Sequence, residues 1–165
     1  MASSTFRSDE EIAEIYEREV KTIYRVCFTY MKNAVDTEDA VSETFFRLIR
    51  STPVFEGFEH ERAWLIRCAI NVCRDSLKHS WRKNKDLADY SEVLRAEDSP
   101  EISDVADVVF SLPERYRVAI YLYYYEGYTS VQIAQMLKKT NSTIRNHLHE
   151  ARKILKERLG ESYEN

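Results

Sequence analysis

Residues 113–158 read PERYRVAIYLYYYEGYTSVQIAQMLKKTNSTIRNHLHEARKILKER, and this stretch predicts two helices joined by a short polar turn. Thr129 is a good helix N-cap, and Gln132 three residues later completes a capping box. The polar run 138–141 then breaks the pattern, and a second helix is expected to begin near Asn141 or Ser142, both of which are capping residue types. The stretch therefore has the pattern of a helix-turn-helix.

The second of these helices has one apolar face and one polar, mostly basic face. The apolar series, at steps of three and four residues, is Ile144, Leu148, Ala151, Leu155 and Leu159. The opposite face carries Arg145, Asn146, His149, Glu150, Arg152, Lys153, Lys156 and Arg158. The second helix of a helix-turn-helix lies in the major groove with its N-terminal residues against base edges, so this face predicts double-stranded DNA as ligand. An ordinary helical hairpin with a solvated basic face fits the same pattern.

Composition favours an all-α protein. Only 3 of 165 residues are Gly and 3 are Pro, fewer turn residues than sheets and long loops need. No apolar run approaches the ~20 residues of a transmembrane helix, and the first residues, MASSTFRSDEE, lack the apolar core of a signal peptide. The odd set of Cys27, Cys68 and Cys73 fits core positions in a reducing compartment better than disulfides or a zinc site. We expect a cytoplasmic protein without a metal.

The net charge of −4 conceals two basic regions separated by an acidic one. Residues 86–112 contain 1 Lys or Arg and 8 Asp or Glu, whereas residues 113–165 contain 9 and 6. Residues 62–85 add 7 cations against the single acid Asp75. Two separate basic patches, rather than bulk charge, set the footprint of a protein on a polyanion.

The first half of the chain predicts a compact domain of three helices. They are expected from residues 8–9 to about Lys32, from a cap at Asp36 to about Ser51, and from about His60 to Lys83. Pro53 and Gly57 mark the loop before the third helix. The residues expected to point inward are Ile12, Ile15, Tyr16, Ile23, Cys27, Val41, Phe45, Leu48, Ile49, Trp64, Leu65, Cys68, Ala69, Val72 and Leu77.

The domain organisation follows from these patterns. We expect a helical domain at 1–85, a flexible acidic linker at 86–102, and a second small helical domain at 103–165. The second domain is expected to begin with a short helix at 103–110. A further helix, with Pro113 in its first turn, is expected to end at Gly127, before the helix-turn-helix.

Three motifs follow one another along the chain. They consist of Asp36, Glu38, Asp39, Glu43, Thr44, Phe45 and Arg47, then Trp64, Leu65, Ala69, Asn71 and Asp75, then Leu112, Pro113, Glu114, Arg115 and Arg117. In this order they resemble the motifs of bacterial RNA polymerase sigma factors of the extracytoplasmic-function (ECF) group. The resemblance extends over residues 10–160. It implies a region 2-like domain at 1–85 and a region 4-like domain at 103–165, with core RNA polymerase and promoter DNA as partners and no cofactor or small-molecule substrate.

The resemblance also implies the roles of individual side chains. The polymerase contacts would be Asp39, Ser42, Glu43 and Phe46. The residues for recognising and melting the minus-ten element would be Phe58, His60, Arg62, Arg67, Asn71, Arg74, Lys78 and Arg82, with Phe55 and Glu61 beside a captured base. In the minus-thirty-five element, the base contacts would be Arg145, Asn146, His149 and Glu150, and the phosphate contacts Arg115, Arg152, Lys153 and Lys156.

Three positions depart from the family pattern. Glu150 stands where a basic residue is frequent, and it either alters sequence preference or pairs with Lys153. Ser42 replaces a common Gln. The turn Lys138-Lys139-Thr140-Asn141 lacks the usual Gly, and a non-Gly residue of positive φ there would cost about 1 kcal/mol.

Other functional classes remain as alternatives. The sequence has no Ser/His/Asp set, Walker loop, HExxH motif or Cys/His cluster, so an enzyme is poorly supported. A stand-alone helix-turn-helix regulator would leave the basic 62–83 and acidic 36–50 segments without a role. A sigma-like decoy that binds only a regulatory protein would not need the basic face of the last helix. The family resemblance implies an anti-sigma factor as a further partner, through which the protein would be held at a membrane.

Overall fold

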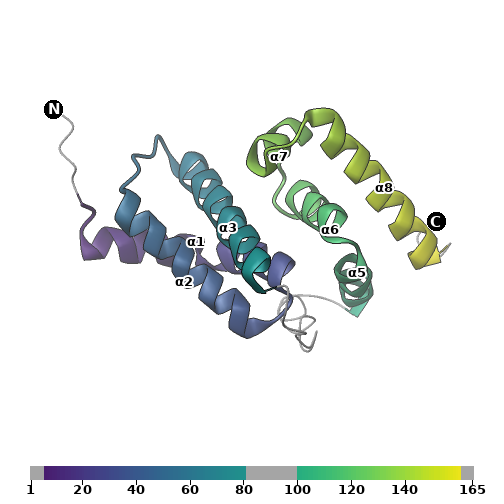
Figure 1. Cartoon of the computed structure of the whole chain (residues 1–165), viewed down its shortest axis with the longest axis horizontal. Coiled ribbons are helices and arrows are strands. Elements are labelled where there is room, and N and C mark those ends of the chain that lie inside the picture. The colour runs from purple at the N-terminus through teal and green to yellow at the C-terminus, as the bar shows by residue number, and fades with distance from the viewer. Residues whose placement is uncertain (1–5, 81–99, 161–165) are drawn as a thin grey trace. The chain divides into compact units, whose positions relative to one another are not determined.

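The computed structural model describes residues 6–80 and 100–160, and the chain divides into two compact units, which are treated separately below. Every regular element in these two ranges is a helix (Figure 1). This confirms the expected all-α class with two helical domains. Within the described ranges, no helix combines the length and hydropathy that crossing a bilayer requires.

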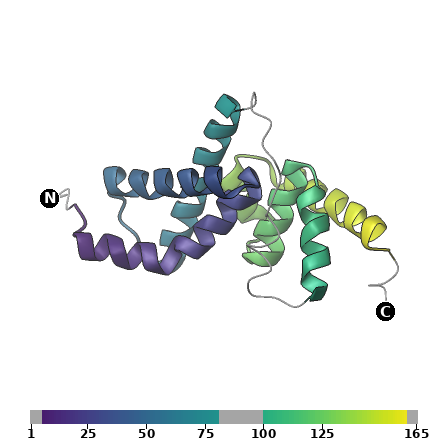
Figure 2. The same ribbon diagram turned by 90° about the horizontal axis from the view of Figure 1, so that it is seen from below.

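The N-terminal unit consists of α1 (Asp9–Met31), α2 (Ala34–Ser51) and α3 (Phe58–Ser80). Each of the three helices contacts the other two (Figures 1 and 2). The fully buried side chains at their centre include Ile23, Phe28, Leu48, Leu65 and Ile66. This apolar centre fixes the outward faces of α2 and α3, which carry most of the candidate contacts of this unit.

Local capping explains where α1 and α2 begin. Ser8 accepts a hydrogen bond from the backbone N–H of Glu11 at the start of α1. The expectation that Asp36 caps α2 is wrong: the cap is Asn33, whose side chain accepts from the N–H of Asp36 at 2.9 Å. Asn is as strong a cap as Asp, and Asp36 instead accepts from the Asn33 amide at 2.8 Å. The helix therefore starts at Ala34.

Several expected core positions differ in the structure. Tyr16 is 48% exposed and Ile49 is 45% exposed, although both were expected to point inward. Tyr16 lies at the edge of the core, where its ring meets Phe45 at a centroid distance of 4.9 Å. Trp64 and Leu77 are only half-buried. The buried face of α3 is instead wider than expected, since it also includes Ile66, Ile70 and Cys73.

The C-terminal unit consists of α5 (Pro100–Ser111), α6 (Glu114–Ile120), the π-helix η1 (Tyr121–Tyr125), α7 (Ser130–Leu137) and α8 (Asn141–Leu159). Helix α8 packs against α5, α6 and α7 (Figure 1). The fully buried residues of this unit include Leu112, Leu122, Ile133, Ile144 and Leu148. The last two residues of the expected apolar series, Leu155 and Leu159, are only half-buried.

The helix that precedes the helix-turn-helix differs from expectation in two ways. Pro113 occupies the N-cap position with an extended ψ of 146° and not the first turn. The expected single helix also changes into a π-turn at η1, where the N–H of Glu126 donates to the carbonyl of Tyr121 at 3.2 Å. Gly127, with φ of 79°, then ends the segment as expected, since this left-handed conformation suits glycine.

Candidate nucleic-acid interface

The helix-turn-helix is built on the predicted capping box. The side chain of Thr129 accepts from the N–H of Gln132 at 3.2 Å, and the Gln132 side chain accepts from the N–H of Thr129 at 2.9 Å. The turn keeps a residue of positive φ although it lacks glycine: Lys138 has φ of 56°. The cap of α8 is Thr140, one residue earlier than expected, and its hydroxyl accepts from the N–H of Thr143 at 3.2 Å.

The candidate base-reading residues lie on the outer surface at the start of α8. Arg145, Asn146 and His149 are exposed, and Glu150 is half-buried. The structure has no ion pair between Glu150 and Lys153, which would be the alternative role for Glu150. The core residues Ile144 and Leu148 fix the rotation of the helix that presents this face.

Arg115, one of the candidate phosphate residues of this unit, lies beside an aromatic ring. The guanidinium of Arg115 lies 4.4 Å from the ring centroid of Tyr116, which in turn meets the ring of His147 at 5.6 Å. Burial, together with the nearby cations Arg115 and Lys139, lowers the pKa of His147 below its usual value. The imidazole of His147 is therefore mainly neutral near pH 7. Lys153 and Lys156 are exposed.

A cavity of about 410 Å³ lies in the N-terminal unit, between the start of α1, the loop 52–57 and the start of α3. Phe55 and Glu61, two of the residues expected beside a captured base, line it. Phe58 is 68% exposed, next to the cavity residue Arg18. His60 is exposed, and its Nδ1 accepts from the N–H of Glu56 at 3.1 Å. The predicted aromatic and acidic residues are thus gathered at one end of α3.

The cavity wall contains backbone strain. Thr52, which lines the cavity, has φ of 44°. A β-branched residue in this left-handed region is a true outlier, and such strain is often found at ligand-contacting positions. Arg7 donates to the carbonyl of Pro53, and its guanidinium lies 4.8 Å from the ring centroid of Phe55.

Two ion pairs join α1 to the start of α3, and their partners on α1, Arg18 and Glu19, are not among the residues expected from sequence. Arg18 donates to both carboxylate oxygens of Glu61, at 2.9 and 2.8 Å. Arg62 donates to Glu19 at 2.9 Å, and Glu19 is only 1% exposed. The hydrogen bond to Glu61 is the main cause that raises the pKa of Arg18. Glu61 and Arg62 therefore have structural partners in addition to any contact with DNA.

The remaining candidates for the minus-ten contact follow one side of α3. Their spacing of four, three and four residues places Arg67, Asn71, Arg74 and Lys78 on a common helix face. Arg67 and Lys78 are exposed, whereas Asn71 and Arg74 are half-buried. Arg82 lies outside the described residues.

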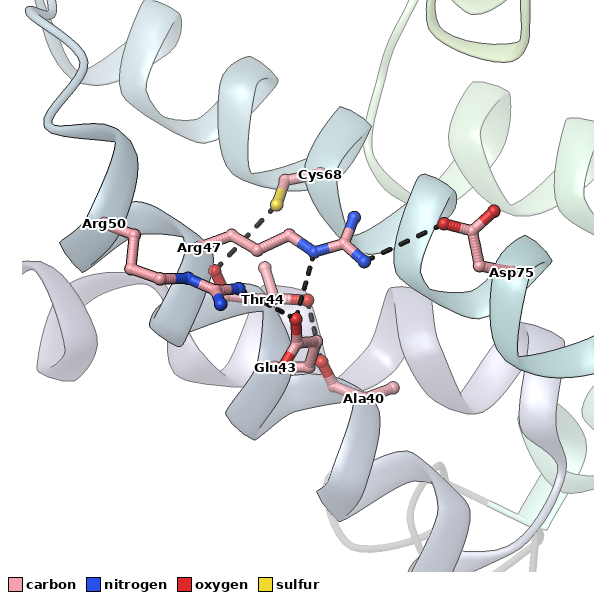
Figure 3. Close-up of polar contacts among 7 residues, drawn as sticks. All are labelled: Ala40, Glu43, Thr44, Arg47, Arg50, Cys68 and Asp75. Atoms are coloured by element: carbon pink, nitrogen blue, oxygen red, sulfur yellow. Dashed lines mark hydrogen bonds and ion pairs between the residues drawn. The ribbon is translucent and has the colours of Figure 1, made fainter.

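The candidate polymerase contacts occupy α2. Asp39, Ser42 and Phe46 are exposed, and Phe46 has 59% of its surface accessible. Glu43 accepts from two arginines, Arg47 at 3.2 Å and Arg50 at 3.1 Å (Figure 3). The guanidinium of Arg50, a residue outside the predicted set, also lies 5.6 Å from the ring centroid of Phe46. Its spacing of seven residues from Glu43 would have indicated this shared face.

Two polar contacts join α2 to α3. Arg47 reaches Asp75 on α3 at 3.8 Å, and the thiol of Cys68 donates to the carbonyl of Thr44 at 3.9 Å (Figure 3). Burial raises the pKa of Cys68 to about 11, so the thiol stays protonated. The cysteines are therefore core residues, and within the described ranges no group of His, Cys, Asp and Glu has the arrangement of a metal site.

Family models identify both units. The Sigma-70 region 2 model matches residues 15–83, and the Sigma-70 region 4 model matches residues 104–155. The related proteins are ECF sigma factors, including SigW of Bacillus subtilis, which is 24% identical over 90% of this chain and 87% of its own length. The chain belongs to the ECF sigma factors.

Other relatives agree with this assignment. SigE of Mycolicibacterium smegmatis is 27% identical over 88% of the chain, although the match spans only 60% of SigE, and the sigma-E factor of Haemophilus influenzae is 29% identical over 75% of each protein. The fold also matches the sigma factor RpoE of Bartonella quintana, solved with the anti-sigma factor NepR, with a TM-score of 0.70, 16% identity and coverage of 91% of this chain and 97% of that one.

Family membership settles the broad function. Sigma factors are initiation subunits that bind core RNA polymerase and promoter DNA and catalyse no reaction themselves. The expected transcription-initiation role is thereby confirmed, and the sigma factor is neither an enzyme nor a stand-alone regulator.

Proposed function

We propose that this sigma factor reads a minus-thirty-five element with the first turns of α8, opens the minus-ten element with the start of α3, and docks on core polymerase through α2. The observation that carries the proposal is the outward face of α8, where Arg145, Asn146 and His149 project from a capped helix-turn-helix. The family models cover both units but assign no individual contact.

The chemistry of the α8 face suits base edges in the major groove. An Arg pairs with the O6 and N7 acceptors of guanine, an Asn pairs with adenine, and a Glu accepts from the amino group of cytosine. Arg145, Asn146 and Glu150 would supply these three functions, with His149 between them. The exposure of Arg145 and Asn146 supports direct contact, whereas the half-buried Glu150 has a smaller accessible edge.

A substitution at Arg145 tests the base-reading role. We expect Arg145→Ala to weaken promoter binding by the polymerase holoenzyme by about 1–3 kcal/mol, because one bidentate base contact is lost. Lys153→Ala is the matched control, since loss of a phosphate contact weakens consensus and scrambled minus-thirty-five DNA alike. Binding would be measured on both DNAs. An equal loss on both DNAs for Arg145→Ala would reduce its role to a phosphate contact.

For the minus-ten element, we infer that the cavity at the start of α3 receives an unpaired base while the α3 face holds the exposed strand. The aromatic ring of Phe55 and the polar groups of Arg18 and Glu61 offer a stacking surface and hydrogen-bonding groups. Phe58 and His60 lie at the same helix end. The cations of α3 that would contact the DNA backbone are Arg62, Arg67, Arg74 and Lys78. Arg82, outside the described residues, is proposed to do the same.

The docking surface on core polymerase is proposed to be the exposed side of α2. Phe46 supplies an apolar anchor, and Asp39, Ser42 and Glu43 supply polar groups around it. The two arginines that bind Glu43 keep its carboxylate in a fixed position. The charge of this face is therefore mixed rather than purely acidic.

An anti-sigma factor is the proposed regulator. The support is the family membership and the likeness to a sigma factor that was solved with its anti-sigma partner. We further propose that the chain acts in the cytoplasm and that its anti-sigma factor would be the route to any attachment at the membrane.

A further inference from the structure

The aromatic segment of η1 contacts the recognition helix at one arginine. The Nε of Arg152 donates to the hydroxyl of Tyr124 at 2.6 Å, across 28 positions of sequence. The same guanidinium lies 5.4 Å from the ring centroid of Tyr123 and 5.5 Å from that of Tyr124. The two rings meet edge to face at 4.9 Å. Three exposed side chains thus form one cluster, which we call the Tyr–Arg cluster: Tyr123, Tyr124 and Arg152.

The π-turn gives this cluster its form. A π-helix has an i→i+5 hydrogen bond and a wider turn than an α-helix, and such turns recur at functional sites. Here the wider turn lies at Tyr121–Tyr125, and it presents consecutive tyrosines to a single guanidinium. Tyr123 is 36% exposed and Tyr124 is 60% exposed, so neither ring is there to fill the core.

The cluster also lies in line with the proposed base-reading face. Arg145 and Arg152 are seven positions apart on α8 and therefore on the same side of the helix. Seven residues of an α-helix rise about 10.5 Å along the axis, comparable with the roughly 12 Å width of the major groove. A helix that places Arg145 against base edges thus brings Arg152 to the edge of the groove, where the phosphates lie.

The remaining hydrogen-bond donors of the Tyr–Arg cluster suit an anion as ligand. The contact to Tyr124 uses only the Nε–H of Arg152, and the described residues offer no partner to its terminal N–H groups. The Tyr124 hydroxyl accepts from Arg152 and still has its own proton to donate. A phosphodiester oxygen at this point would receive hydrogen bonds from both residues.

We propose that Tyr124 and Arg152 form one binding site for a DNA backbone phosphate, in which Tyr124 orients the guanidinium and donates a second hydrogen bond. This inference rests on the proposed placement of α8 in the major groove. It adds Tyr124 to the contacts expected from sequence, whereas the hydroxyl of Tyr123 takes no part in the site.

Tyr124→Phe is the test variant, because it keeps the ring and removes only the hydroxyl. Tyr123→Phe is the matched control, since its hydroxyl has no partner among the described residues. The full-length chain would be assembled with core polymerase, and its affinity for promoter DNA measured over a salt series. The set is completed by Arg152→Ala and by the double variant Tyr124→Phe with Arg152→Ala.

We expect Tyr124→Phe to weaken binding about ten- to hundredfold, because a hydrogen bond to a charged group is lost. The loss should be equal on consensus and scrambled minus-thirty-five DNA. Arg152→Ala should weaken binding further and reduce the salt slope by about one. Tyr124→Phe should have a smaller effect in the Arg152→Ala background than in the unmodified chain, because its role in orienting the guanidinium is then already lost. Tyr123→Phe should bind like the unmodified chain.

The outcomes separate this inference from the proposed function. If Arg152→Ala weakens binding but Tyr124→Phe does not, or if the two losses simply add, the shared phosphate site is refuted and the DNA contact of α8 remains. If Arg152→Ala changes neither affinity nor salt slope while Arg145→Ala does, the groove assignment survives and the site at Arg152 is refuted. If neither arginine matters, the placement of α8 itself is wrong.

Discussion

Glu19 is a buried carboxylate of the N-terminal unit that needs a counter-ion. Its carboxylate is 1% exposed, one oxygen binds Arg62, and the other oxygen is buried without a hydrogen-bond partner. A buried carboxylate is tolerated only when a cation compensates for its lost hydration. Arg62, which family resemblance assigns to DNA, is therefore also the counter-ion of the core.

Replacement of Arg62 should separate these two roles. We expect Arg62→Ala to lower the free energy of unfolding by about 2 kcal/mol, because it leaves a buried charge unpaired while the arginine itself is partly exposed. Arg67→Ala, at an exposed position of the same helix, should change stability by less than about 0.5 kcal/mol. Urea unfolding followed by circular dichroism measures both.

A double variant is the control for this prediction. Replacing Glu19 by Leu together with Arg62 by Met removes both charges and should restore most of the lost stability. Equal stability of Arg62→Ala and Arg67→Ala would contradict the counter-ion role of Arg62.

At the residue scale, sequence reasoning succeeded where helical spacing decides exposure and failed where distant residues meet. Arg145, Asn146 and His149 are exposed because the apolar positions of α8 fix the other face. The pairs between α1 and α3 join residues 43 positions apart, and no local pattern indicates them. The same holds for the contact of Arg152 with η1.

At the scale of single elements, caps and glycines were predicted better than backbone irregularities. The capping box of α7 was predicted, whereas the N-caps of α2 and α8 are Asn33 and Thr140, which lie three residues and one residue before the caps expected from sequence. The π-turn at η1 has no established residue signature, so a continuous helix was the reasonable expectation from sequence.

The turn of the helix-turn-helix offers an element-scale prediction. Lys138 has φ of 56°, and the N–H of Lys139 donates to the carbonyl of Ala134 at 2.9 Å, as in a Schellman-type helix end. Lys138→Gly should stabilise the C-terminal unit by about 0.5–1 kcal/mol, because glycine adopts this conformation without a Cβ clash.

Lys139→Gly is the control for that prediction, since its φ is negative and glycine only adds freedom to the unfolded chain. It should destabilise the unit slightly. Thermal unfolding of the full chain, with both variants in parallel, gives the comparison. A lower midpoint for Lys138→Gly would argue against a strained turn.

At the scale of the whole molecule, charge distribution was more informative than net charge. The net charge of −4 does not reveal that the end of α3 and one face of α8 are basic, each in its own helical unit. Most of the acidic segment between them, residues 86–99, lies outside the described residues. The assignment to two units and one family was accessible from sequence because three motifs occur in order, whereas the partners of individual side chains required the structure.

The central claim is that this chain gives core RNA polymerase the ability to choose a start site. Transcription in vitro, with purified core polymerase and a library of promoter sequences, tests it most directly. We predict that adding the chain starts transcription only on templates that share a minus-ten and a minus-thirty-five sequence. Initiation that is equally frequent with and without the chain, or that is spread evenly over the library, would contradict the account.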